Sequence, residues 1–263
     1  MTKFKEMMES VAKLQEIKGS TAGLVSISRN LFREEASKIN QDGDLSPGGK
    51  AKARTALQKQ YGEAFIKNAR QLREDYDKAV VKASVAAEFL LNEEPAKPSP
   101  TAVASFEREF FALKTELMLE TRPDNAMRKL KAFAEAQNDA YLAKQVLNDF
   151  PSVVQSVLDT AGTDKAKYKL ELQNTLTSIR DKSMTDEQKK AQEIHAGMAN
   201  EFGRDIFLQN GIEYNAIQEA FGPEFARAAN SPQYYLLEEE KLTNNHNGCP
   251  RGWLFYIYER VNA

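Results

Sequence analysis

Cysteine and histidine are scarce in this 263-residue chain, which has one cysteine, Cys249, and two histidines, His195 and His246. A single cysteine excludes an intramolecular disulfide framework and fits a reducing compartment. His195 has no second histidine four residues away, so the helical zinc-protease pattern is absent. His246 and Cys249 lie three residues apart in a loop, but a structural zinc site needs four ligands. We therefore expect no metal and no cofactor.

Long hydrophobic runs are also missing. No window approaches the roughly 20 apolar residues that a helix needs to cross a bilayer. The first residues include lysines, but no apolar core of the signal-peptide kind follows them. These absences predict a soluble protein that acts in the cytoplasm where it is made.

The sequence also lacks a large excess of either positive or negative charge. Lysine and arginine total 36 against 38 aspartate and glutamate, a net charge of −2, so nucleic acid is not expected as a partner. Basic residues early in the stretch 46–92 could contact phosphates, but acidic residues interrupt them and no recognition motif accompanies them. Gly48-Gly49-Lys50 lacks the spacing of a phosphate-binding loop. No catalytic constellation stands out, so we interpret the chain as a non-enzyme.

Helical periodicity is what the sequence has in abundance, above all between Ser46 and Asn92. Apolar residues recur there every three or four positions, and no proline or capping glycine interrupts them. One helix over this range would be roughly 70 Å long at 1.5 Å per residue. Another helix of the chain, a second copy or a larger surface must cover its apolar stripe. The candidate partner contacts on this stripe are Tyr61, Phe65, Leu72 and Tyr76.

The spacing of apolar residues over 3–39 predicts a first long helix, and Gly19 and Gly23 lower its helix propensity. These glycines predict a bend or a close crossing, and we favour close packing of small residues against a neighbour. The loop at 40–49 resembles an EF-hand calcium loop, but Lys38 and Gly49 stand where acidic ligands are required. A turn followed by an N-cap and a helix-starting proline at Ser46-Pro47 explains the segment better. The two helices should therefore form an antiparallel hairpin.

Three prolines, Pro95, Pro98 and Pro100, predict an extended linker at 94–101. We expect a hairpin domain over 1–93 before this linker and a helical bundle over 102–263 after it. The fold class predicted from the whole pattern is all-α.

Shorter helices follow the linker. The stretch 102–121 has a buried-type row at Phe106, Phe110, Leu113 and Leu117 and a second row at Phe111 and Met118, which suits burial on two sides. Pro151 predicts the end of one helix, and Thr185 and Gln188 predict a capping box for a helix that continues through Phe202 and Ile206. The last three helices are expected at 212–221, 223–230 and 233–242. Unequal spacing argues against a repeat array.

The C-terminus changes character and is rich in aromatic and β-favouring residues. A lone short strand is one interpretation of this tail, and a lone strand must pair with an edge. The tail either packs into the chain's own core or adds to a neighbouring molecule. Its candidate partner contacts are Trp253, Phe255, Tyr256 and Tyr258.

The hairpin with its Leu45-Ser46-Pro47-Gly48-Gly49-Lys50 turn, and with Tyr61 and Tyr76 on a charged rod, resembles small helical proteins encoded among the virion genes of tailed bacteriophages that infect Gram-positive bacteria. The resemblance covers residues 1–92 and carries no functional residue. It implies a structural part of a virion or an assembly factor, with self-copies or other assembly components as protein partners. The alternative is a soluble helical adaptor or regulator that binds a host or effector protein.

Overall fold

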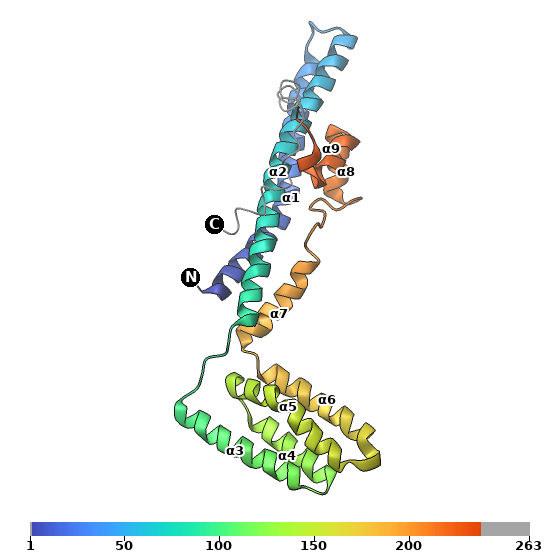
Figure 1. Ribbon diagram of the computed structural model, residues 1–263. Helices are drawn as coiled ribbons and strands as arrows, with labels where there is room; N and C mark the ends of the chain where they lie inside the picture. Colours follow the sequence, from blue (N-terminus) through green and yellow to red (C-terminus); the bar gives the residue numbers. More distant parts are fainter. Residues whose placement is uncertain (1, 238–263) are drawn as a thin grey trace, which may run out of the picture. The chain divides into compact units, whose positions relative to one another are not determined.

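Every regular element in the described part of the chain is helical. A computed structural model describes residues 2–237, with nine α-helices and two short 3₁₀ helices among them and no strand in that range. This confirms the all-α prediction for the described residues (Figure 1). The expected strand and its aromatic residues Trp253, Phe255, Tyr256 and Tyr258 lie outside the described residues.

The chain divides into two compact units that differ from the predicted domains. Among the described residues, 10–81 and 201–237 form one unit, called the hairpin unit here, and 2–9 with 82–200 form the other, the bundle unit. The predicted boundary at 94–101 therefore does not separate the units. The reason is that the second long helix contributes to both of them, and that the last described helices return to the hairpin.

Two long helices, α1 (Lys3–Gln41) and α2 (Pro47–Asn92), are joined by a short turn. The backbone N–H of Asp44 donates to the side chain of Asp42 at 2.8 Å, and the N–H of Gly49 donates to the Ser46 hydroxyl at 3.2 Å. Lys50 also donates to the carbonyl oxygen of Asn40 across the turn at 2.8 Å. These bonds satisfy the helix ends, as the turn interpretation requires, and α2 is continuous as predicted.

The two glycines of α1 do not mark a close crossing. α1 runs through both without a break, and a Cβ added at Gly19 or Gly23 would meet nothing within 4 Å. The expectation that small residues pack there against a neighbour was wrong, because these glycines face open space.

The core of the hairpin unit combines residues 24–36 of α1 and 57–72 of α2 with two helices from much later in the sequence. These are α8 (Ile212–Phe221) and α9 (Pro223–Asn230). Gly222 separates them with a φ of +107°, which favours glycine, and Pro223 starts α9 where no N–H is needed. The cluster includes Phe32, Phe65, Ile66, Phe207, Ile217, Phe221 and Phe225.

At Gly62 of α2 an aromatic side chain packs directly against the helix backbone. The ring of Phe225 lies so near that a Cβ on Gly62 would be 2.6 Å from it. Phe225 is buried and also packs against Tyr235, with 5.5 Å between ring centroids. The absence of a side chain at position 62 is therefore what lets α9 lie against α2.

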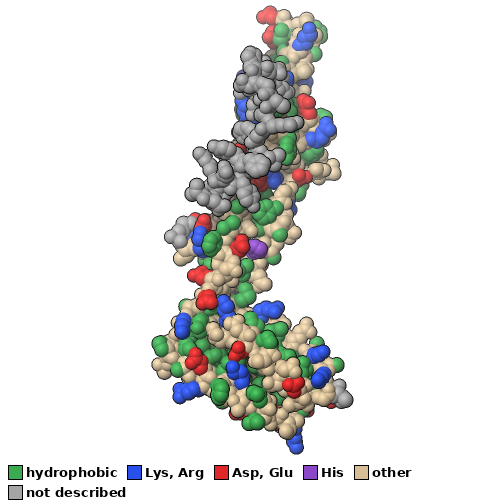
Figure 2. Space-filling model, in the orientation of Figure 1, with side chains coloured by type: hydrophobic (Ala, Val, Ile, Leu, Met, Phe, Trp, Pro, Cys, Tyr) green, Lys and Arg blue, Asp and Glu red, His purple; other side chains and the backbone are tan. Residues whose placement is uncertain are grey.

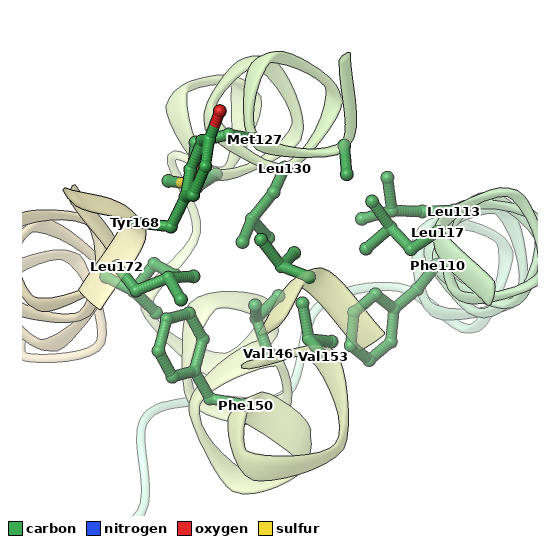
Figure 3. Packing of buried hydrophobic residues seen from close by; sticks show 14 of the residues in the cluster. Phe110, Leu113, Leu117, Met127, Leu130, Val146, Phe150, Val153, Tyr168 and Leu172 are labelled. Atoms are coloured by element: carbon green, nitrogen blue, oxygen red, sulfur yellow. The ribbon is translucent and has the colours of Figure 1, made fainter. Parts of the chain in front are cut away.

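Four helices form the main core of the bundle unit: α3 (Pro100–Leu119), α4 (Pro123–Ala136), α5 (Ala140–Thr160) and α6 (Lys165–Lys182). Their buried side chains converge in one cluster, as Figure 3 shows for Leu117, Leu130, Val146 and Phe150 among others. A 3₁₀ turn, η1 (Gly162–Asp164), links α5 to α6. Ser99 caps α3 by accepting a hydrogen bond from the N–H of Ala102, so the helix starts slightly earlier than expected.

Helix α7 (Asp186–Ala199) completes the bundle unit, and the predicted capping box of Thr185 and Gln188 is present. The Gln188 side chain also donates to the carbonyl oxygens of Leu90 at 3.1 Å and Glu93 at 2.7 Å. It thereby satisfies acceptors at the C-terminal end of α2, where helices leave carbonyl groups without internal partners.

Besides the start of α3, three helix boundaries differ from the sequence prediction. Pro151 lies inside α5, which continues to Thr160 because one face stays buried on both sides of the proline. α7 ends at Ala199, so Phe202 and Ile206 are outside it, and Gly203 takes a φ of +71° in the turn that follows. Of the helix expected at 233–242, the described residues contain only the 3₁₀ turn η2 (Pro232–Tyr234).

Candidate interaction surface

The outer face of α3 exposes more large apolar side chains than any other helix face of the bundle unit. Its first row, Phe106, Phe110, Leu113 and Leu117, is buried against α4 and α5. The second row is not covered: Phe111, Met118 and the neighbouring Leu119 are 70%, 74% and 77% exposed. Both rows were predicted from the sequence. The prediction that both would be buried was wrong for the second row, which no other described part of the chain covers. Figure 2 shows hydrophobic side chains between charged ones on the face of the bundle that it presents.

A shallow groove of about 330 Å³ adjoins this face, between α3 and α5. Its lining is largely aromatic, with Phe106, Phe110, Phe111 and Tyr141. Stacked rings build its floor, since the centroids of Phe106 and Phe110 are 5.4 Å apart. Such a surface suits an apolar or aromatic side chain of another molecule.

Lysines lie over the aromatic rings of the groove. The Lys114 ammonium is 4.8 Å from the Phe110 ring centroid and forms an ion pair with Asp149 at 2.9 Å. Lys97 lies 6.0 Å from the Tyr141 ring centroid. The groove therefore has an apolar floor and charged edges, an arrangement typical of protein contact surfaces.

Charges also mark the C-terminal end of α3. Lys129 of α4 pairs with Glu116 at 3.0 Å and with Glu120 at 3.3 Å, and these carboxylates raise the pKa of the lysine. Partial desolvation would raise the pKa of Glu120, but hydrogen bonds from Arg122 and Lys129 outweigh it and lower the pKa. Glu116 keeps 57% of its side chain exposed and remains accessible.

The predicted contact residues of α2 belong to the core of the hairpin unit instead. Phe65 and Tyr76 are each 1% exposed, so the chain's own helices cover them and neither is available to a partner. Tyr61 and Leu72 are half-buried against the same cluster. Other helices of the same chain therefore cover this part of the stripe. The sequence had left three possibilities open: another helix of the chain, a second copy or a larger surface.

Tyr76 belongs to a polar cluster that the sequence did not predict. Its hydroxyl donates to Glu201 at 2.5 Å, and Glu201 also accepts from Lys18 at 2.8 Å and pairs with Arg204 at 3.2 Å. Burial raises the pKa of Tyr76, and the bond to Glu201 adds to this. Burial would raise the pKa of Glu201, but Lys18 and Tyr76 outweigh it and lower the pKa. This cluster holds α1, α2 and the segment after α7 together.

A second buried polar contact also escaped sequence reasoning. The side-chain oxygen of Asn230 accepts from the N–H of Phe207 at 2.8 Å, and its amide nitrogen donates to the Phe207 carbonyl at 2.7 Å. This pair fixes Phe207 in the core of the hairpin unit. Neither Asn230 nor Glu201 had a signal in the sequence, because Phe207 lies 23 residues from Asn230, and Tyr76 and Lys18 lie far from Glu201 along the chain.

The described residues contain no group of three or more His, Cys, Asp or Glu side chains that could hold a metal ion. His195 is exposed on α7, in line with a solvated helical histidine, and His246 and Cys249 lie outside the described residues. None of the described helices is long and apolar enough to cross a membrane.

Comparison of the chain with protein-family models, curated proteins and solved structures gave no match. The resemblance of residues 1–92 to phage virion proteins therefore stays a hypothesis.

Proposed function

We propose that this protein is a non-enzymatic, helical structural protein that acts by protein–protein contact within a larger assembly. The single observation that supports it most is the uncovered second row of α3, where Phe111, Met118 and Leu119 expose most of their side chains on one helix. Clusters of exposed large apolar residues with polar edges are a mark of interaction sites on soluble proteins.

The hairpin supports the same proposal by a different route. Helix α2 has 46 residues, and its apolar stripe is satisfied within the chain, so the hairpin is a prefolded rod that needs no partner to keep its shape. A rod of this kind is suited to spacing or bracing other components. We propose a phage virion component or assembly factor as the setting, on the resemblance of residues 1–92.

The alternative function is a soluble adaptor or regulator that binds a host or effector protein. The groove between α3 and α5 favours it, because its aromatic floor and its lysines suit one inserted side chain of a single partner.

A photo-crosslinking amino acid placed at position 111 tests the contact proposal in cells that make the full chain. We expect a protein adduct at position 111 well above that at position 170, because Leu170 of α6 is also exposed, at 63%, but lies outside the α3 face. Equal yields at the two positions would remove the support that the α3 face gives to a contact function.

A further inference from the structure

We propose that the outer face of α3 pairs with the same face of a second copy of this chain, as two antiparallel helices related by a two-fold axis at Ala112. The inference rests on the contact function proposed above and names the partner.

The exposed residues of α3 have the spacing of a helix-pairing seam. Ala104, Phe111 and Met118 recur every seven residues and lie within about 40° of one another around the helix, at about 100° per residue. Arg108 and Thr115 lie beside them one turn further along. A seven-residue recurrence is the spacing by which two helices keep one face in contact over several turns. The face extends from Ala104 to Leu119, about 22 Å.

Charge complementarity indicates a second copy and an antiparallel direction. About an axis at Ala112, Arg108 of one copy lies opposite Glu116 of the other, and the symmetry makes this pair twice. Arg108 has no carboxylate partner within the described part of the chain, and Glu116 keeps 57% of its side chain exposed beside Lys129. Parallel helices in register would instead place like charges side by side, which is unfavourable.

The apolar side chains fit the same arrangement. Ala112 is small, so the two helices can approach closely at the axis, as small residues allow elsewhere. Phe111 then lies about 3 Å along the helix from its counterpart in the second copy, within reach of ring contact. Met118 falls near Ala104 of the second copy, a large side chain against a small one. The seam has an apolar centre and a charged rim, as protein interfaces do.

The proposed interface is small. One helix from each copy buries less than about 1,200 Å² in total, the size of weak and transient contacts, so we expect a dissociation constant of about 1–100 µM. The pairing should therefore depend on concentration and should add to other contacts in an assembly.

Sedimentation velocity of the full chain over a concentration series tests the pairing. We expect a monomer–dimer equilibrium that Phe111→Ser weakens about tenfold or more, as loss of a central aromatic contact does. Leu170→Ser removes an apolar side chain of similar exposure, 63% against 70% for Phe111, from α6 and should leave the equilibrium unchanged. Far-UV circular dichroism confirms that each variant keeps its helices.

Charge reversal distinguishes specific pairing from nonspecific hydrophobic association. Arg108→Glu or Glu116→Arg alone should weaken the dimer, because each places like charges opposite one another, and the double reversal should restore it. A dimer that neither single reversal affects would overturn the proposed register.

A cysteine at the axis provides an independent test. In a Cys249→Ser background, Ala112→Cys should form an intermolecular disulfide under mild oxidation, because only residues at the axis meet their own counterpart. Leu170→Cys is the matched control and should not.

The outcomes distinguish this proposal from the contact function on which it rests. A chain that stays monomeric at all concentrations, with no disulfide at position 112, overturns the self-pairing. If position 111 nevertheless crosslinks to a different protein in cells, the contact function stands while the second copy is wrong. An adduct of twice the chain mass supports both.

Discussion

At the scale of single residues, Gly62 is a position where sequence and structure predict opposite effects of a substitution. A glycine inside a helix ordinarily costs about 1 kcal/mol relative to alanine, so replacement should stabilise the helix. At Gly62 the ring of Phe225 occupies the space that a Cβ would need.

We therefore expect Gly62→Ala to lower the free energy of unfolding by about 1–3 kcal/mol, because overpacking outweighs the gain in helix propensity. Gly23→Ala is the matched control on α1, where a new Cβ meets nothing within 4 Å, and it should raise the free energy of unfolding by up to about 1 kcal/mol. Urea unfolding followed by circular dichroism measures both. Equal gains in both variants would show that Phe225 does not press on α2.

The cluster around Tyr76 and Glu201 predicts a dependence of stability on pH. The pKa of Glu201 is lowered in the folded chain, so its contribution is present above the ordinary carboxyl pKa of 4.5 and is lost as pH falls through the folded value. The pKa of Tyr76 is raised, so its contribution is present below the ordinary value of 10.0 and is lost as pH rises toward the folded value.

We expect Tyr76→Phe to cost about 1–3 kcal/mol at neutral pH, because Glu201 loses a donor at a largely buried site. The difference between wild type and variant should shrink at strongly alkaline pH. Tyr61→Phe on the same helix is the control and should change little. Urea unfolding from acid to alkaline pH provides the test, and a variant that matches the wild type at neutral pH would contradict it.

At the scale of elements, Pro151 shows how tertiary packing overrides a local rule. A proline inside a helix removes one backbone hydrogen bond and costs about 3 kcal/mol or more in an isolated helix. α5 nevertheless continues, since Val146, Phe150, Val153 and Val157 are buried on one face across the proline. The burial of these four side chains offsets the lost bond.

We expect Pro151→Ala to stabilise the chain by about 1 kcal/mol or more, because an N–H at position 151 can donate to the carbonyl of Leu147 and position 151 is exposed. Thermal unfolding measured by calorimetry would show a higher melting temperature. A lower one would mean that α5 depends on the geometry that the proline imposes.

At the scale of the whole molecule, the two cores are assembled in different ways. The bundle core draws its buried residues from one continuous stretch, Phe106 to Ile179. The core of the hairpin unit draws on residues from Val25 to Ala69 and again from Phe207 to Leu237. One core is local in the sequence, and the other needs distant segments.

This difference predicts how fragments behave. A fragment of residues 96–184 contains the whole bundle core and should be helical and unfold cooperatively in urea. A fragment of residues 1–93 lacks Phe207, Phe221 and Phe225, so it should unfold at lower urea than the hairpin of the full chain. Circular dichroism of both fragments tests this. A hairpin fragment as stable as the intact hairpin would restore 1–93 as a domain in its own right.

Local patterns were enough to predict the helices and the turn at Ser46-Pro47, because periodicity and capping depend on neighbours a few residues apart. The capping box of Thr185 and Gln188 was equally local, but the second use of Gln188 on the end of α2 was not. The α3 face was partly predictable: its second row is visible in the spacing, whereas its exposure depends on which helices happen to pack nearby.

The sequence by itself therefore determined that this is a helical chain with a long hairpin, since hydrogen bonding along a helix and the 3.6-residue period are local properties. Tertiary structure alone decided that α8 and α9 pack against Phe65, Ile66 and Ala69 of α2, that Glu201 and Asn230 are structural, and that Phe111 and Met118 stay uncovered. Those outcomes depend on contacts between residues more than 20 positions apart. Local sequence patterns do not specify which distant segments pack against one another.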